Sequence, residues 1–536
     1  MAAAPLETLR RDWVEVPTLG DLVVRRAARW PETDAVVFPE RRETGAELLA
    51  SSVASARSLL GLGLVRGETV AILMPNELPY LHVLYGCAMI GVRALLVNAR
   101  YKAYELAYVL ENADVVAVVT SDTVSEYVDF VPVLNEATAK RPPLLRELVL
   151  LGGSSPAGFV DAVGFEAAGE QVSRDDVHHL RSSVPLREVA ILMYTSGTTA
   201  QPKGCLITHE ALVRTAVSVA RRWTLTADER FWDPLPFFHM GGLLQLTANL
   251  YAGGAFMTMT HFEAGAALRQ MAAERTTFAF PTFPTITRSL VHHPDFAATD
   301  LSRVRCVLDT GPPESLREIE ALFGIPSVTS YGLTEAGGVI TFGHPEDPPE
   351  KRHGTGGRPF RGMEVRVVDP ETEEDVPAGE LGSVLVRGVG LFEGYYKDEE
   401  HTRQAMAGGW LHTGDLGVVD EDGRVSYGGR SKDMLKVGGE NVSALEVEAF
   451  LGTHPAVKVV SVVGVPDEKY QEVPAAFVER VPGATVTEEE LIGHCKGQIA
   501  SFKVPRYVRF VEEWPISATK IQKFRLRESL VSELGL

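Results

Sequence analysis

The chain has 536 residues, a formal net charge of −19 and 45% hydrophobic residues. This length exceeds one ordinary domain and supplies ample apolar material for a core, so two or more domains are expected. The acidic balance argues against nucleic acid as a partner, because binding to a phosphate backbone requires a basic surface.

The four cysteines, at positions 87, 205, 306 and 495, lie far apart and form no Cys-x-x-Cys pair. This spacing predicts buried thiols in a reducing compartment rather than a zinc site or a disulfide framework. No apolar run approaches the length of a membrane span, and the first residues lack the apolar core of a signal peptide. We therefore expect a cytoplasmic protein without stable membrane insertion.

The first part of the chain alternates between two kinds of apolar pattern. Residues 17–65 have helical periodicity. The elements predicted next are a strand at 70–74, a helix at 81–90, a strand at 94–97, a helix at 103–112 and a strand at 115–120. Nearly continuous apolar strands that alternate with helices indicate a parallel sheet covered on both faces. Residues 137–185 are polar and interrupted by Pro and Gly, which predicts a loop-rich connection.

A polar loop follows the buried strand predicted at residues 189–193. The segment Tyr194–Gly204 gathers hydroxyls, a glycine and a lysine, namely Thr195, Ser196, Gly197, Thr198, Thr199 and Lys203. Such groups can surround phosphate oxygens, and the lysine adds a point charge. The loop is not a Walker P-loop, because Pro202 precedes the lysine and no Gly-Lys-Ser/Thr opens a helix. A helix is predicted at 209–222, with its first turn close to the loop.

Two further segments combine residue types that suit a binding site. Residues 233–242 contain two phenylalanines, His239 and two glycines, although an aromatic core cluster with a hydrogen-bonded histidine is the alternative reading. Residues 330–335 contain an aromatic ring that can stack on a base, a glycine, a hydroxyl and Glu335. Mg²⁺ takes only one or two carboxylates besides phosphate oxygens and water, so one glutamate can serve it.

Beyond residue 355 the composition changes to short strands and turns, including strands predicted at 363–368 and 382–387. These indicate a small β subdomain. The last hundred residues predict a compact α+β unit with a helix at 444–451, strands at 457–465 and 475–481, a helix at 488–498 and a strand at 507–511. The predicted domains are therefore residues 1–430 and residues 431–536.

Five motifs occur in a fixed order along the chain: Tyr194–Gly204, Tyr331–Glu335, Trp410–Asp415, Gly429–Val442 and Ile516–Ile521. Together they resemble the motifs of the adenylate-forming superfamily, which includes acyl-CoA synthetases, aryl-CoA ligases, luciferases and amino-acid adenylation domains. The resemblance implies an α/β fold with a large N-terminal domain of parallel-sheet subdomains and a small β subdomain. It also implies a mobile, small α+β C-terminal domain.

The resemblance implies ATP, Mg²⁺ and coenzyme A as the small molecules bound. The residues that it assigns to ATP and CoA are Thr195, Ser196, Gly197, Thr198, Thr199, Lys203, Gly311, Tyr331, Gly332, Asp415, Arg430, Lys436, Gly438 and Gly439. Asp415 is the expected acceptor for the ribose hydroxyls, with Arg430 as the second ribose contact. Glu335 is the expected Mg²⁺ ligand, and Thr334 offers a hydroxyl to phosphate.

The resemblance also implies a pivot and a catalytic lysine in the C-terminal part. Lys432 matches the hinge position, about which the small domain turns between the two half-reactions. Lys520 aligns best with the catalytic lysine, and Lys523 is the fallback. The family has a glycine directly before this lysine, whereas Thr519 stands there in this chain.

The expected substrate pocket is apolar. Its residues are Phe238, Met240, Gly241, Gly242, Phe283 and Pro312, with His239 as a catalytic gate residue. Amino-acid adenylation domains place an aspartate after the aromatic residue of this motif, where this chain has His239, so amino-acid activation is disfavoured. Two prolines at 312 and 313 depart from the family's Gly/Ala-rich turn and remove two backbone donors.

The sequence therefore predicts an AMP-forming acid–CoA ligase for a hydrophobic fatty, aryl or bulky alicyclic acid. One alternative is an acyl-AMP ligase that loads the phosphopantetheine of a carrier protein. Another is a non-catalytic nucleotide-binding homologue, supported by Ala200 and Thr519 at positions where the family has glycine. A homodimer and a carrier protein stay open as partners.

Overall fold

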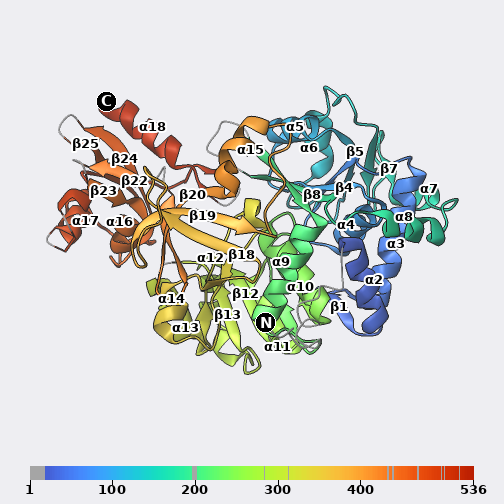
Figure 1. Ribbon diagram of the computed structural model, residues 1–536, viewed down its shortest axis with the longest axis horizontal. Coiled ribbons are helices and arrows are strands. Elements are labelled where there is room, and N and C mark those ends of the chain that lie inside the picture. Colours follow the sequence, from blue (N-terminus) through green and yellow to red (C-terminus); the bar gives the residue numbers. More distant parts are fainter. Residues whose placement is uncertain are drawn as a thin grey trace, which may run out of the picture. The chain divides into compact units, whose positions relative to one another are not determined.

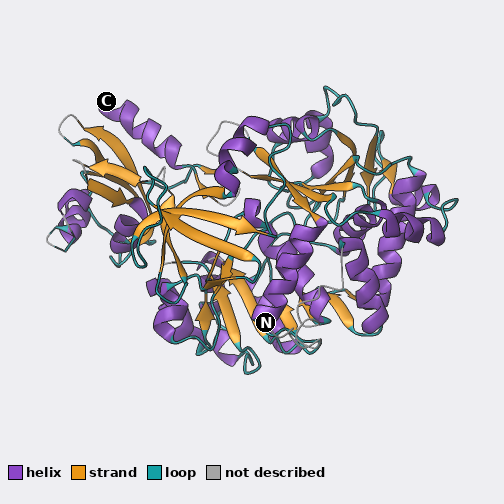
Figure 2. Cartoon of the chain, viewed as in Figure 1, coloured by secondary structure: helices purple, strands orange, loops and turns teal. Residues whose placement is uncertain are grey.

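The computed structural model describes residues 18–195, 202–282, 284–311, 313–430, 434–437, 440–467, 470–496, 498–499, 501–517 and 520–536. Packing divides the chain into two compact units. The first unit contains residues 1–364 and 386–411, and the second contains residues 365–385 and 412–536. Figures 1 and 2 show their helices and strands.

Among the described residues, one seven-stranded sheet of the first unit has the order β7-β6-β5-β3-β4-β8-β9. Its strands are β3 (Thr69–Leu73), β4 (Arg93–Leu96), β5 (Val115–Thr120), β6 (Glu147–Leu150), β7 (Val160–Asp161), β8 (Val189–Thr195) and β9 (Lys203–Thr208). Neighbours are parallel except β8 and β9. The central strands β3 and β5 are buried throughout, as their continuous apolar sequences require.

A second seven-stranded sheet in the described part of the first unit has the order β14-β13-β12-β10-β11-β1-β2. Its strands are β1 (Asp34–Val37), β2 (Arg42–Thr44), β10 (Arg230–Trp232), β11 (Ala255–Met257), β12 (Phe278–Thr282), β13 (Cys306–Asp309) and β14 (Ser327–Val328). All neighbours are parallel except β1 and β2. A small antiparallel sheet follows, formed by β15 (Ser330–Tyr331), β16 (Thr341–Phe342) and β17 (Arg358–Pro359).

The helices in the described part of the first unit cover these sheets. They are α2 (Leu19–Arg29), α3 (Gly45–Gly61), α4 (Leu78–Ile90), α5 (Ala103–Asn112), α6 (Phe130–Ala137), α7 (Ala162–Ala168), α8 (Arg174–Ser183), α9 (His209–Arg222), α10 (Met240–Ala252), α11 (Ala264–Ala273), α12 (Pro284–Val291), α13 (Pro313–Phe323), α14 (Pro349–Gly354) and α15 (Glu399–Ala405). Helix α4 is apolar on every side and correspondingly buried. Helices α9 and α10 lie side by side (Figure 1).

In its described part, the second unit contains most of a four-stranded sheet, and a five-stranded mixed sheet. The first comprises β18 (Met363–Val368), β19 (Leu381–Gly388), β20 (Leu411–Val419) and β21 (Val425–Arg430). The other comprises β22 (Met434–Val437), β23 (Glu440–Ser443), β24 (Val457–Asp467), β25 (Gln471–Arg480) and β26 (Tyr507–Phe510). Helices α16 (Ala444–Leu451), α17 (Glu488–Cys495) and α18 (Lys523–Leu534) accompany it, as does the small hairpin of β27 (Ile516–Ser517) and β28 (Lys520–Ile521).

The predicted fold class is confirmed, with parallel α/β sheets, a small β sheet and an α+β C-terminal part. The prediction of a loop-rich connection at residues 137–185 is wrong, because this stretch contains β6, β7, α7 and α8. Helix α8 buries only Val177 and therefore lacks an apolar stripe. Its N-terminus is instead stabilised by a capping box between Ser173 and Asp176.

The predicted position of α9 beside the polar loop is also wrong. Strand β9 pairs antiparallel with β8, so that Lys203 lies opposite Thr195 and Thr208 lies opposite Val189. The chain therefore runs back for about 17 Å, at about 3.3 Å per residue, before α9 begins. The predicted helix at 488–498 ends earlier, at Cys495.

All four cysteines are buried and unpaired, as predicted. Within the described ranges, none of the helices combines the length and apolar character needed to cross a bilayer.

Candidate active site

The first group of predicted site residues lies at the paired ends of β8 and β9. Thr195 closes β8 and Lys203 opens β9, opposite each other in the register, and both are half-buried. Ser196, Gly197, Thr198 and Thr199, which connect them, lie outside the described residues. The antiparallel pairing thus fixes the base of the predicted phosphate loop and places its lysine there.

Thr334 and Glu335 lie in a single 3₁₀ turn, Thr334–Ala336, which follows strand β15. Gly337 ends this turn with φ = 69°, a left-handed conformation that glycine adopts without strain. The backbone N–H of Phe392 donates to the carbonyl oxygen of Glu335 at 2.9 Å. The carboxylate that we expect to serve Mg²⁺ is therefore held on a short, anchored turn.

The preceding residues of this motif, Tyr331 and Gly332, pack closely against neighbouring parts of the chain. A Cβ at Gly332 would lie 2.2 Å from the carbonyl oxygen of Gly338 and 2.5 Å from the Cα of Val339. The glycine is therefore required by a close approach of the backbone itself. Tyr331 is buried, with 6% of its surface exposed.

Tyr395 connects the two groups, and its role was missed from the sequence. Its hydroxyl donates to Glu335 Oε1 at 2.9 Å, and Lys203 Nζ lies 5.1 Å from the centre of its ring. A lysine ammonium at this distance is attracted by the aromatic face. The structure thus brings together Lys203 and Glu335, through a residue whose only sequence signal is a glycine followed by two tyrosines.

The same two charged residues influence the buried thiol of Cys205. Burial raises the pKa of the Cys205 thiol well above its ordinary value, and the nearby Glu335 carboxylate raises it further, while Lys203 opposes the shift. The thiol is therefore neutral at physiological pH.

The predicted substrate residues Phe238, His239 and Met240 lie at the start of α10. Phe238 and Met240 are buried, and the rings of Phe238 and His239 are 4.7 Å apart. A Cβ at Gly242 would lie 2.7 Å from the Leu235 carbonyl oxygen. This glycine, like Gly241 beside the Leu235 side chain, lets the preceding turn pack closely on the helix.

Met240 also packs against the turn that follows Glu335. A Cβ at Gly338 would lie 2.8 Å from Met240 Cβ and 3.1 Å from its Cε. The methionine side chain therefore fills the space beside this glycine, which has φ = 98°. An apolar side chain thus lies next to the Glu335 turn.

Strands β12 and β13 carry a buried hydrogen-bond network at their carboxyl ends. Asp309 is fully buried, accepts from the backbone N–H of Thr310 at 2.6 Å and accepts from the hydroxyl of Thr287. Thr310 in turn donates to the Thr282 carbonyl oxygen from its hydroxyl at 2.7 Å and its N–H at 3.0 Å. Burial raises the pKa of Asp309 to about 6, against the hydrogen bonds that it accepts.

This network supports the turns that lead into the predicted pocket. Thr282 has φ = 61°, an unfavourable left-handed conformation for a β-branched residue, and Phe283 comes next. Gly311 follows Thr310 and is exposed, with its nearest packing neighbour the Ser315 side chain at 3.4 Å from an added Cβ. Phe283 and Pro312 lie outside the described residues. Asp309 and Thr287 were not among the predicted site residues.

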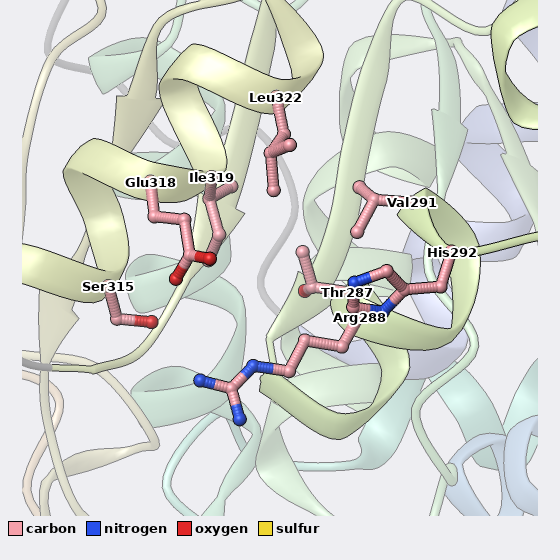
Figure 3. A pocket seen from close by; sticks show the side chains of 8 residues that line it. All are labelled: Thr287, Arg288, Val291, His292, Ser315, Glu318, Ile319 and Leu322. Carbon is pink, nitrogen blue, oxygen red and sulfur yellow. The ribbon is translucent and has the colours of Figure 1, made fainter. Parts of the chain in front are cut away.

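A groove lies next to this network, between α12 and α13 (Figure 3). Thr287 and Arg288 face Ser315 and Glu318 across it. Its free volume is about 10 Å³, enough for no more than about one water molecule. The groove is therefore too small to be the acyl pocket.

In the second unit, Asp415 and Arg430 are directly opposite each other on β20 and β21. Arg430 Nε lies 2.9 Å from Asp415 Oδ1, and its Nη1 donates to the Thr413 carbonyl oxygen at 3.0 Å. The Asp415 side chain is 3% exposed and that of Arg430 is 35% exposed. The two residues predicted to bind the ribose, Asp415 and Arg430, are therefore already paired, and the Arg430 guanidinium is partly exposed to solvent.

The two candidate lysines of the C-terminal motif differ in their surroundings. Lys520 begins β28 in the small hairpin with β27, and its side chain lies outside the description. Lys523 begins α18, and its Nζ donates to Glu448 Oε1 on α16 at 2.7 Å. Lys523 therefore joins two helices of this unit.

The predicted CoA residues belong to the β22–β23 hairpin. Lys436 pairs with Asn441, and Val437 pairs with Glu440, which leaves two glycines between the paired strands. These residues, Gly438 and Gly439, and the predicted pivot Lys432 lie outside the described residues. The side chain of Lys436 is likewise not described.

A Mg²⁺ ion fits the donor set near the phosphate loop. Among the described residues, no group of three or more His, Cys, Asp or Glu side chains could enclose a metal ion. Mg²⁺ does not need such an enclosure, because it is commonly held by one or two carboxylates, phosphate oxygens and water. Glu335 has one oxygen hydrogen-bonded to Tyr395, which leaves the other oxygen as the donor for a cation.

The model of the AMP-binding enzyme family matches residues 23–396, and that of the AMP-binding enzyme C-terminal domain matches residues 446–520. A Bacillus subtilis protein, YngI, named provisionally as an acyl-CoA synthetase, is 37% identical over 97% of this chain and 98% of its own length.

Two further comparisons concern proteins with named substrates. A Mycobacterium tuberculosis CoA ligase for a methyl-dioxo-octahydro-indenyl propanoyl group is 34% identical over 96% of this chain and 98% of its own length. The crystal structure of the anthranilate–CoA ligase AuaEII with anthranoyl-AMP has a TM-score of 0.84 and 28% identity. That match covers 98% of this chain and 99% of AuaEII. The chain belongs to the AMP-binding enzyme family of adenylate-forming enzymes and is an AMP-forming acid–CoA ligase.

Proposed function

We propose that the protein activates a hydrophobic carboxylic acid with Mg²⁺-ATP at the turn of Glu335 and the β8–β9 loop. The acyl group then passes to CoA. The observation that carries this proposal is that Lys203 and Glu335 share one aromatic side chain, Tyr395. A cation for phosphate oxygens and a carboxylate for a metal ion therefore lie together, on elements far apart in the sequence.

In the first half-reaction, an oxygen of the substrate carboxylate attacks the α-phosphorus of ATP. The bond from that phosphorus to the bridging oxygen breaks, and pyrophosphate leaves. The protein must offset the repulsion between two anions and hold the line of attack. The hydroxyls of Thr195, Ser196, Thr198 and Thr199, with Lys203, hold the β- and γ-phosphates. Bound Mg²⁺ supplies positive charge to the phosphate oxygens.

Other residues position the nucleotide and the reacting carboxylate. Asp415 accepts hydrogen bonds from the ribose hydroxyls, with Arg430 beside it. Tyr331, Gly332 and Gly311 contact the adenine, and Thr334 donates to a phosphate. We assign to Lys520 the role of bridging the substrate carboxylate and the α-phosphate. The involvement of Lys523 in a bond to Glu448 supports this assignment of Lys520.

In the second half-reaction, the CoA sulfur attacks the acyl carbon and AMP leaves, while the thiol proton passes to solvent. We assign Lys436, Gly438 and Gly439 to the path of the CoA arm and Lys432 to the pivot between the two half-reactions. On this proposal residues 1–430 and 431–536 act as two bodies. A conformational step of this kind needs only one or two residues that absorb a large backbone change.

We assign the acid to the hydrophobic class of fatty, aryl or bulky alicyclic carboxylates. Phe238 and Met240 are buried apolar side chains, and Met240 lies beside the Glu335 turn. His239 lies between them in the sequence. The named acids of two similar proteins, anthranilate and an octahydro-indenyl propanoate, also carry rings. Phe283 and Pro312 complete the proposed pocket with Gly241 and Gly242.

The test is pyrophosphate release from Mg²⁺-ATP across a panel of fatty, aryl and polycyclic acids, with and without CoA. We expect sustained release only when an accepted acid and CoA are both present, with acyl-CoA identified by mass. Lys520→Ala protein serves as the control for contaminating activity. Release without thioester would overturn the assignment of CoA as acceptor. If the wild-type protein binds ATP tightly but releases no pyrophosphate with any of the acids, the assigned substrate class is overturned.

A further inference from the structure

Tyr395 has side-chain contacts with two residues to which the proposed function gives roles. Its hydroxyl donates to Glu335 Oε1 at 2.9 Å, and its ring lies 5.1 Å from Lys203 Nζ. The Phe392 ring packs edge-on against it, with the ring centres 4.9 Å apart and the planes at 76°. The tyrosine is thereby held from the side while it contacts both charged residues.

The backbone around Tyr395 joins the same two structural elements. The N–H groups of Glu393 and Tyr396 donate to the carbonyl oxygens of Leu206 and Gly204 on β9, at 2.8 and 2.7 Å. The N–H of Phe392 donates to the Glu335 carbonyl oxygen at 2.9 Å. Residues 392–396 therefore link the strand that begins at Lys203 to the turn that carries Glu335.

The conformation of this segment is fixed independently of the site. The N–H of Tyr395 donates to Thr402 Oγ1 on α15 at 2.8 Å. Gly394 has φ = 131°, and a Cβ there would lie 2.6 Å from Thr402 Cγ2. The close packing of α15 on this glycine sets the direction from which the Tyr395 side chain leaves the backbone.

We infer that Tyr395 is a positioning residue for the adenylation half-reaction. It orients the Glu335 carboxylate toward the metal–triphosphate complex and holds the Lys203 ammonium near it before the nucleotide binds. This inference rests on the proposed function, in which Glu335 serves Mg²⁺ and Lys203 serves the phosphates. It adds a residue outside the five motifs that identified the family.

The hydrogen bond from Tyr395 makes the two oxygens of the Glu335 carboxylate different. One oxygen accepts from the tyrosine, so the other oxygen would meet a bound cation in one fixed orientation. Groups that hydrogen-bond to metal ligands in this way fix the ligand geometry, and their loss typically lowers metal affinity or activity by about 10- to 100-fold. Donation to an anion also enriches the ring in electrons, which strengthens its attraction for the lysine.

The chain offers a matched control at the next position. The hydroxyl of Tyr396 donates to Asp114 Oδ2 at 2.9 Å, a similar bond to a carboxylate that has no proposed role in the reaction. Tyr395→Phe and Tyr396→Phe each remove one hydroxyl from a half-buried tyrosine and retain the ring. A difference between the two variants therefore reports the specific partner, Glu335, rather than the general loss of a tyrosine hydroxyl.

The experiment measures ATP binding and both half-reactions in the full-length protein. ATP affinity is determined by titration calorimetry at increasing Mg²⁺ concentrations, without acid. Tyr395→Phe is expected to need about 10- to 100-fold more Mg²⁺ for the same ATP affinity. Tyr396→Phe should match the wild type. Pyrophosphate release by Tyr395→Phe should fall to a similar extent, whereas thioester formation from prepared acyl-AMP should stay within about two-fold of wild type.

Three outcomes would overturn the inference: an unchanged Mg²⁺ dependence in Tyr395→Phe, equal losses in the two tyrosine variants, or equal losses in both half-reactions. A wild-type protein that binds Mg²⁺-ATP but turns over no acid would count against the proposed function alone. The calorimetric comparison of the variants would then still decide the role of Tyr395, because it requires no turnover.

Discussion

Lys523 Nζ donates to Glu448 Oε1 at 2.7 Å and so joins the first turn of α18 to α16. The side chains of the pair are 23% and 13% exposed. A lysine held in this way is a structural element of the small unit. Three residues earlier, Lys520 lies on a short hairpin instead of a helix. Two lysines of one basic segment thus have different structural settings.

This difference predicts opposite effects of two alanine substitutions. Lys520→Ala should lower acyl-adenylate formation by about 10²-fold or more, the scale of losing one electrostatic donor at a transition state. Lys523→Ala should leave that rate within about three-fold and lower the free energy of unfolding by about 0.2–1 kcal/mol. Pyrophosphate exchange and thermal unfolding of both variants provide the measurements. A catalytic loss confined to Lys523→Ala would reverse the assignment.

The Asp415–Arg430 pair predicts that a substitution of Asp415 weakens ATP binding and leaves binding of the acid nearly unchanged. Asp415→Asn keeps the size of the side chain but removes the charge that accepts the ribose hydroxyls and pairs with Arg430. Because hydrogen bonds to charged groups contribute about 1.5–3 kcal/mol, KM for ATP should rise about 10- to 150-fold. KM for the acid should change little.

Asp420 supplies the control for this prediction, because it lies on the same hairpin. It accepts from the N–H groups of Asp422 and Arg424 at 3.0 and 2.9 Å, at the turn end of β20 and β21. Asp420→Asn should leave KM for ATP near the wild-type value. A similar rise in both variants would indicate distortion of the hairpin instead of a lost ribose contact.

The sequence predicted local elements where periodicity and length agree, such as α5 and α9, whose bounds match the prediction. It missed the return of the chain along β9, because an antiparallel reversal depends on pairing and not on the composition of the strand. Lys203 and Glu335 could be predicted from the sequence because each stands in a motif that resembles those of the adenylate-forming superfamily. The sequence prediction missed Tyr395, 60 residues from Glu335, because only the folded backbone brings the two together.

Asp309 illustrates the same limit on the substrate side. No predicted motif assigns a role to Asp309, which ends an apolar strand. In the structure it is fully buried and holds Thr287, 22 residues earlier in the chain. Its function as a link between β13 and α12 depends on the packing of that helix, which local residue types do not encode.

Glu320 predicts a loss of stability at acidic pH. Burial opposes its ionisation, but hydrogen bonds from Arg352, the N–H of Ser327 and His353 outweigh burial and lower the pKa of Glu320 to about 2. The folded state therefore favours the ionised carboxylate. The stabilisation is present above the ordinary pKa of about 4.5 and is lost as the pH falls toward 2.

The measurement is the midpoint of thermal unfolding between pH 2 and pH 6. In the wild type, this midpoint should fall more steeply with decreasing pH than in Glu320→Gln, which has no carboxylate to protonate. Glu318→Gln, an exposed position on the same helix, should follow the wild type. Parallel curves for wild type and Glu320→Gln would refute the proposed contribution.

Asp309 predicts the opposite dependence on pH. Its pKa is raised by burial to about 6, so the folded state favours the neutral acid. The stabilisation is present below the ordinary pKa of about 3.8 and is lost as the pH rises through about 6. In Asp309→Asn, the amide oxygen can accept from Thr310 and the amide nitrogen can donate to Thr287, so the network is kept without a titrating charge.

The difference in unfolding free energy between Asp309→Asn and wild type should therefore shift in favour of the variant as the pH rises from 5 to 8. Over this range the gain should be about 1.4 kcal/mol, because only the one unit from pH 5 to the pKa of about 6 lies within it and each pKa unit corresponds to about 1.36 kcal/mol. Urea unfolding at the two pH values measures the difference, and Asp295→Asn, on an exposed turn, should show none. A gain for Asp309→Asn that is equal at both pH values would mean that the carboxyl group does not titrate in the folded protein over this range. Only a pH-dependent gain agrees with a carboxyl group that ionises while it stays buried between β13 and α12.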